Sequence, residues 1–159
     1  MSNNYQQFSI ALRIKDVELV DAVIEFVDNI HEEDYETDDG EVVVATIPSC
    51  FDQEDKDYLV DSINQWGGVG DWRNHQDTEL SVCAEESANL EAVTFILQKL
   101  LIADAIEGNY QGGVLITWAN TCSKMRPDEF SGGACYVTKG EIHWQPDPIS
   151  WIDTNNLAK

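Results

Sequence analysis

The spacing of apolar residues changes abruptly at Asp16, and this change limits the folds open to the chain. Residues 7–14 alternate apolar and polar side chains, and a period of two predicts a half-buried strand. From Asp16 onward the apolar residues recur every three or four positions, which predicts an amphipathic helix over residues 16–32. A strand followed directly by such a helix favours a sheet with helices packed on it.

The next two segments predict a second strand and a second helix. Residues 41–48, EVVVATIP, form a β-branched run that we interpret as a buried strand. Ser49 or Asp52 can cap a helix over about 52–66, because such side chains accept hydrogen bonds from the N–H groups of a first turn. The inner side of this helix is predicted to carry Leu59, Ile63 and Trp66.

A loop, a short strand and a third helix follow. The glycine-rich residues 67–77 are predicted to be a loop, and residues 78–84 a strand. A helix that begins after Ser87 or Asn89 and ends near Gly108 is apolar over most of its circumference. We therefore expect it to be the most buried of the three helices.

The last third of the chain is predicted to be rich in strands. Residues 113–119 predict one strand, and residues 134–144 predict a hairpin with Lys139-Gly140 as its turn. The whole order is β-α-β-α-β-α-β-β. It predicts one domain over residues 1–159, of the α+β (or α/β) class, in which a single-layer sheet is covered by about three helices and ends in a C-terminal hairpin.

Charge is the most unusual property of the composition. The 159 residues contain 30 acidic and 9 basic side chains, a net charge of −21. Residues 1–107 hold 25 acids and 5 bases, whereas residues 108–159 hold 5 and 4. This surplus excludes nucleic acids and anionic membranes as partners of the first two-thirds, because binding them requires a basic surface. General adaptation to high salt would instead spread the acids over the whole surface.

The acids of the first two helices fall into rows. Within residues 16–32 they recur at steps of three and four, so they share one helix face, and this segment contains no base. Like charges at this spacing destabilise a helix slightly, which favours a functional reason for the row over an ordinary solvated face. The row consists of Glu18, Asp21, Glu25, Asp28 and Glu32, and the second helix repeats it with Glu54, Asp57 and Asp61.

Residues 31–41, HEEDYETDDGE, contain seven carboxylates and extend the first row. An EF-hand requires a glycine at position six and a following helix, and neither alignment of this segment supplies both. We interpret the segment as the densest part of one negative surface. Its contributors are Glu33, Asp34, Glu36, Asp38 and Asp39.

In size and charge layout the chain resembles small acidic proteins of phages and other mobile elements, the anti-CRISPR and anti-restriction DNA mimics. The resemblance covers the first two-thirds of the chain and rests on no motif. It implies a non-enzymatic inhibitor that binds the basic groove of a nuclease or of another nucleic-acid-binding protein complex. A row of carboxylates can imitate a phosphate backbone, which carries one charge every ~3.4 Å along a strand. An immunity protein that neutralises a nuclease toxin would use the same electrostatics and is the alternative.

A third hypothesis is a small enzyme that uses Cys122 or Cys135 with His143. It requires the strands that carry these residues to bring thiol and imidazole together. The other interpretation is that the cysteines are reduced thiols packed as small apolar residues, since no CxxC pair is present. No histidine has the spacing of a zinc pair, and no phosphate-binding glycine motif occurs, so we expect no metal and no cofactor.

The sequence also bears on the location of the protein and on its assembly. No apolar run approaches the ~20 residues needed to span a bilayer, and the N-terminal residues lack the pattern of a secretory signal, so a cytoplasmic location is expected. Trp151 lies in the C-terminal segment PDPISWI and is a candidate contact in a homodimer or with another partner.

Overall fold

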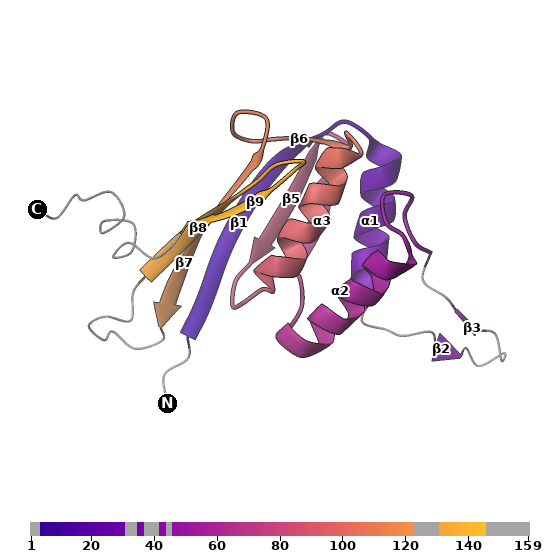
Figure 1. Cartoon of the computed structure of the whole chain (residues 1–159), viewed down its shortest axis with the longest axis horizontal. Helices are drawn as coiled ribbons and strands as arrows, with labels where there is room; N and C mark the ends of the chain where they lie inside the picture. Colours follow the sequence, from indigo (N-terminus) through magenta and orange to yellow (C-terminus); the bar gives the residue numbers. More distant parts are fainter. Residues whose placement is uncertain (1–3, 31–34, 37–41, 44–45, 123–130, 146–159) are drawn as a thin grey trace, which may run out of the picture.

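A computed structural model describes residues 4–30, 35–36, 42–43, 46–122 and 131–145. Seven antiparallel strands form one open sheet in the order β4-β5-β1-β7-β8-β9, with β6 also paired to β1 (Figure 1). The seven are β1 (Asn4–Ile14), β4 (Asp71–His75), β5 (Glu79–Ala84), β6 (Ile106–Glu107), β7 (Val114–Cys122), β8 (Ser131–Val137) and β9 (Ile142–Gln145). A separate two-stranded sheet pairs β2 (Tyr35–Glu36) with β3 (Val42–Val43).

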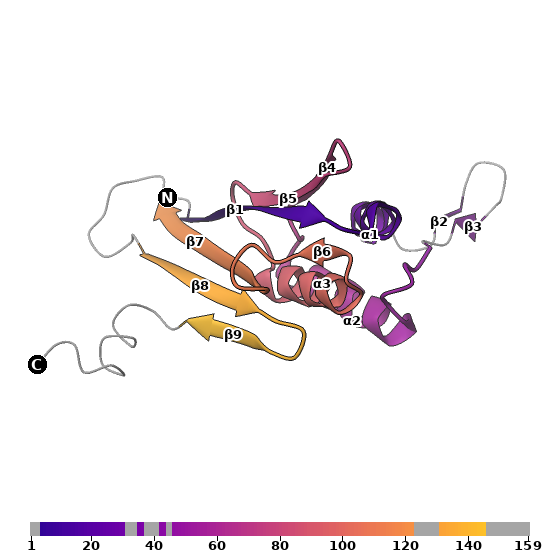
Figure 2. The ribbon, with the colours of Figure 1, turned by 90° about the horizontal axis from the view of Figure 1, so that it is seen from above.

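The first strand holds the two halves of the main sheet together. Residues 4–7 of β1 pair with β7, whereas residues 8–13 pair with β5 on the opposite edge of the strand. The last two residues of β1 pair with β6. Figure 2 shows the strands spreading from β4 at one edge to β9 at the other.

Three helices lie on one side of this sheet (Figure 1). They are α1 (Val17–Asn29), α2 (Gln53–Trp66) and α3 (Leu90–Ile102), and each begins at a polar cap. Asp16 accepts a hydrogen bond from the Leu19 N–H, and Asp52 forms a reciprocal capping box with Asp55. Asn89 accepts from the Ala92 N–H. Each cap satisfies a first-turn donor that would otherwise lack a partner, which is why the helices begin where they do.

The core lies between the helices and the inward face of the sheet. On β1, Phe8, Ile10, Leu12 and Ile14 are buried while the residues between them are exposed, as the alternation predicts. Eight of the thirteen residues of α3 are buried, more than in α1 or α2. This confirms α3 as the most buried helix. The predicted α+β class and the C-terminal hairpin, with β9 at an edge of the sheet, are also confirmed.

Four local predictions differ from the structure, in whole or in part. Among the described residues of 41–48, Val42–Val43 is a strand and residues 46–48 are not, and this strand pairs with Tyr35–Glu36 in the separate two-stranded sheet. The predicted loop 67–77 contains β4, in which only Trp72 is fully buried, so its alternation is weak.

The other two errors concern the ends of α2 and α3. Trp66 does not face the core but is 69% exposed, because it lies at the last residue of α2. The third helix ends at Ile102, and Ile106–Glu107 after it forms β6, which was not predicted.

Candidate functional site

The acidic residues predicted on the first helix lie on its solvent side. Glu18, Asp21, Glu25 and Asp28 are all exposed, opposite the buried face of α1, and we call them the α1 row. Successive members are one turn apart, about 5 Å along the axis. The amide of Asn74 on β4 donates a hydrogen bond to Asp21 (2.8 Å), which places the α1 row beside an edge strand of the sheet.

The acidic residues of α2 are of two kinds: one is half-buried and has a structural role, and the others are exposed. Asp55 is half-buried, completes the capping box and pairs with Lys99 of α3 (N–O 3.4 Å). Glu54, Asp57 and Asp61 are exposed, and we call them the α2 row. Asp57 accepts a hydrogen bond from Gln53 (3.0 Å), one turn earlier. The α2 row is therefore the set that the sequence predicted.

The remaining predicted acids cannot be placed in the same way. Glu32, Glu33, Asp34, Asp38 and Asp39 lie outside the described residues. Glu36 is described only through the backbone of β2. Of the acids that the sequence predicted for the negative surface, the structure therefore shows those of the α1 row and the α2 row to be exposed.

Three basic side chains of the described part of the chain pair with acids outside the α1 row. Lys15 pairs with Asp104 (2.5 Å), and this hydrogen bond lowers the pKa of Asp104 below its ordinary value. Arg13 lies 3.9 Å from Glu107, and Lys99 pairs with Asp55. Among residues 4–30, 35–36, 42–43, 46–122 and 131–145, no Lys or Arg forms an ion pair with the α1 row. These carboxylates are exposed to solvent and have no ion-pair partner in this part of the chain.

The structure separates the thiol and imidazole of the enzyme hypothesis. Cys135 on β8 is buried on the helix side of the sheet, and burial raises the pKa of its thiol to about 11. His143 pairs in register with Tyr136, the next residue of β8, so its side chain is on the opposite face. Cys122 is seven residues along β7 from Leu115, the β7 neighbour of Tyr136, which is about 23 Å. Cys135 and His143 therefore form no thiol–histidine pair, and the backbone of Cys122 lies far along the sheet from that of His143.

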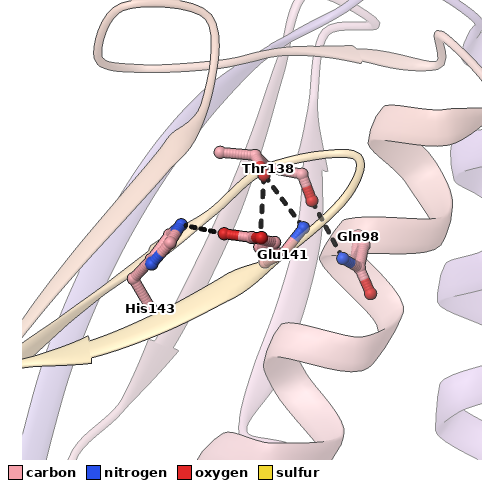
Figure 3. A network of polar contacts seen from close by, with 4 residues as sticks. All are labelled: Gln98, Thr138, Glu141 and His143. Atoms are coloured by element: carbon pink, nitrogen blue, oxygen red, sulfur yellow. Dashed lines mark hydrogen bonds and ion pairs between the residues drawn. The ribbon is translucent and has the colours of Figure 1, made fainter.

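His143 belongs instead to a network that fixes the C-terminal hairpin (Figure 3). Its Nε2 lies 2.9 Å from the Glu141 carboxylate. The Thr138 hydroxyl and the Glu141 backbone N–H close the turn through a 3.0 Å hydrogen bond. Gln98 of α3 donates to the Thr138 carbonyl (2.9 Å), so the hairpin is tied to the buried helix. This hydrogen bond connects the turn at the end of β8 to α3.

A pocket of about 550 Å³ is lined by residues at the end of α2, at the start of α3, and on strands β7 and β9. Three of its seven lining residues are tryptophans: Trp66 ends α2, Trp118 comes from β7 and Trp144 from β9. Trp66 is 69% and Trp144 45% exposed, while Trp118 is half-buried. The rings of Trp118 and Trp144 meet edge to face, with centroids 6.1 Å apart. We call this site the tryptophan pocket.

The first turn of α3 forms the remaining wall of the tryptophan pocket. Leu90 and Glu91 line it together with Asn89, and the Glu91 side chain is exposed. Asn89 is buried, and its amide donates to the Ser62 hydroxyl of α2 (2.8 Å) while its carbonyl oxygen caps α3. One residue therefore fixes the position of both helices at the pocket.

Sequence reasoning did not predict the tryptophan pocket. Its three indoles are 52 and 26 residues apart along the chain, which no local pattern relates. One residue of the sequence is related to this pocket, because Gly133 on β8 lies opposite Trp118 on β7. A Cβ at Gly133 would lie 2.3 Å from Trp118 Cζ2, so this position on β8 leaves the space that the indole occupies.

Three further observations concern the chain as a whole. No helix in the described ranges is long and apolar enough to cross a membrane. The same residues contain no group of three or more His, Cys, Asp or Glu side chains arranged to hold a metal ion. Comparison of the chain with protein-family models, with curated proteins and with solved structures found no match.

Proposed function

We propose that this protein is a non-enzymatic acidic inhibitor that binds the basic groove of a nuclease or of another nucleic-acid-binding defence complex. It would act in the cytoplasm of a host cell, in the manner of anti-CRISPR and anti-restriction proteins. The observation that carries the proposal is the α1 row: four exposed carboxylates, one per turn, on a helix with no base in its last turn. The α2 row adds three more exposed carboxylates.

The mechanism follows from electrostatics. A basic groove is evolved to bind phosphates, and each carboxylate of the α1 row offers it a negative charge at about 5 Å spacing on a rigid support. The approach is steered over a distance of about 8 Å at physiological ionic strength, the Debye length. Association is then fast and falls as salt rises.

Reversal of the α1 row tests the proposal. The variant with Glu18, Asp21, Glu25 and Asp28 all changed to Lys should not retain a partner from host lysate at low salt. The intact protein should retain one, release it on a salt gradient, and compete with nucleic acid for it. Circular dichroism checks that the variant still contains its helices.

A pair of double variants controls for net charge. Glu18→Lys with Glu25→Lys changes the net charge by the same amount as Asp71→Lys with Glu79→Lys. Asp71 and Glu79 are exposed on β4 and β5, on the sheet face away from the helices. Only the first pair should weaken binding by more than tenfold. Equal loss from both pairs would show that net charge alone is recognised, and no loss from the quadruple reversal would refute the proposal.

A further inference from the structure

The tryptophan pocket combines two features that together attract a cation. Trp66, Trp118 and Trp144 present indole rings, whose faces carry the negative part of the aromatic quadrupole. Glu91 adds a full negative charge at the rim. The lining contains no basic side chain among the described residues.

The protein already contains one occupied site of this chemistry. The ammonium of Lys99 lies over the ring of Phe95, 5.4 Å from its centroid, and pairs with Asp55 (3.4 Å). Here an aromatic ring, a carboxylate and a cation form a set within the fold. The tryptophan pocket has the ring and the carboxylate, and it opens to solvent.

One local effect opposes a cation in the tryptophan pocket, because the positive end of the α3 dipole lies there. That end is equivalent to about half an elementary charge. Asn89 has taken up the Ala92 N–H, and Glu91 carries a whole negative charge in the same turn. The Glu91 carboxylate also reaches beyond the pocket: after burial, it is the second cause of the raised pKa of Tyr58. The net local charge is therefore negative.

We propose that the tryptophan pocket binds the guanidinium of an arginine side chain that projects from the basic partner, an inference that rests on the proposed function. A guanidinium is planar, stacks on indole faces and donates to a carboxylate through a fork of N–H groups. The volume of about 550 Å³ exceeds that of one side chain, so the flanking backbone of the partner can enter as well. Arginine and tryptophan are also the residues that most often carry the binding energy of interfaces.

The test is an NMR titration of the full chain with N-acetyl-arginine methylamide, followed through the indole N–H signals. The uncharged probe N-acetyl-citrulline methylamide has nearly the same shape and serves as the control. The signals of Trp66, Trp118 and Trp144 should move with the arginine probe, with a Kd in the low-millimolar range. The Trp72 indole is buried and donates to the Val69 carbonyl (2.9 Å), so its signal should stay in place.

Two variants test whether the arginine probe binds in the tryptophan pocket. Glu91→Gln removes the charge and Trp66→Ala removes the most exposed ring, and each should weaken binding about fivefold or more. Glu86→Gln changes an exposed acid that does not line the pocket and should leave the affinity unchanged within twofold. Equal binding of the citrulline probe, or no effect of Glu91→Gln, would overturn the proposal. Tighter binding of N-acetyl-lysine methylamide than of the arginine probe would overturn the choice of arginine.

The same design separates this inference from the proposed function. Reversal of the α1 row should leave the affinity of the arginine probe within twofold, because α1 does not line the pocket. If the reversal abolishes partner binding while Glu91→Gln and Trp66→Ala do not affect it, the inhibitor proposal stands and the arginine site fails. If the pocket variants abolish probe binding but no basic partner is retained from lysate, the pocket binds guanidinium and the inhibitor proposal fails.

Discussion

The α1 row and the tryptophan pocket differ in how they can recognise a partner. The α1 row consists of charges on an open helix face, with no enclosing surface of its own. The tryptophan pocket has a defined volume, three rings and a single carboxylate. Charge on an open face acts at a distance and tolerates variation in the partner, whereas a pocket acts only at contact and requires a matching group.

Because of this difference, the association rate and the lifetime of a complex can depend on separate parts of this molecule. Exposed charges chiefly change the association rate and its salt dependence. Contacts made only in the docked complex, such as a side chain held in a pocket, chiefly change the dissociation rate. We therefore expect the salt dependence of binding to follow the α1 row and the lifetime of the complex to follow the pocket.

The largest loss of stability is expected from Asn89→Ala. This substitution disrupts the tryptophan pocket and leaves the α1 row unchanged. It removes the N-cap of α3 and the buried hydrogen bonds to Ser62, and should lower the free energy of unfolding by about 2–3 kcal/mol. Urea unfolding measures the loss. Asn89→Ser keeps a capping oxygen and should recover part of it; equal losses would show that the cap does not contribute.

A smaller loss of stability is expected from Gly133→Ala. This substitution changes the tryptophan pocket by displacing the Trp118 indole and leaves the α1 row unchanged. The added Cβ would lie 2.3 Å from Trp118 Cζ2, so the indole must shift, at about 1–2 kcal/mol of unfolding free energy. The arginine probe should bind more weakly while the salt dependence of partner association stays unchanged. Gly140→Ala is the control, because its Cβ would have no atom within 4 Å.

The smallest effect is expected from Asp28→Lys, which separates stability from function in the α1 row. The last turn of α1 has no base, so a cation there should favour the helix dipole and relieve repulsion with Glu25. The free energy of unfolding should rise by about 0.5 kcal/mol while partner association slows. Glu18→Lys, in the first turn, should slow association to a similar extent but lower stability. Equal signs of the two stability changes would contradict the dipole explanation.

Strong local patterns predicted most of the fold. The alternation of Phe8, Ile10, Leu12 and Ile14 and the apolar circumference of α3 determine which faces are buried, so these elements were correct. The strand β4 was missed because Trp72 is its only fully buried residue, and flanking glycines hid the alternation. The β-branched run at 41–48 predicted a strand, but its composition does not specify a partner, and among the described strands Val42–Val43 pairs with Tyr35–Glu36.

The two parts of the candidate site also differ in how far the sequence predicts them. The exposed members of the α1 row and the α2 row follow from helical spacing alone, and the structure agrees with them. The tryptophan pocket depends on the register of β7, β8 and β9 and on the Asn89–Ser62 connection between helices. Such long-range pairings produce no periodic pattern in the sequence. Trp66 shows the limit, since its helical spacing placed it inward although it ends its helix beside the pocket.

The division of β1 between two sets of partners also sets the order in which the molecule can form. Asn4 pairs with Cys122, and Phe8 pairs with Ala84, so the strand that is synthesised first binds segments that are synthesised much later. Contacts so distant along the chain slow folding, because the loop between them must close before they form. During synthesis, α1 is made long before β1 has either neighbour. During synthesis β1 therefore gains its β5 neighbour before its β7 neighbour, and the two halves of the main sheet can join through β1 only after β7 has been synthesised.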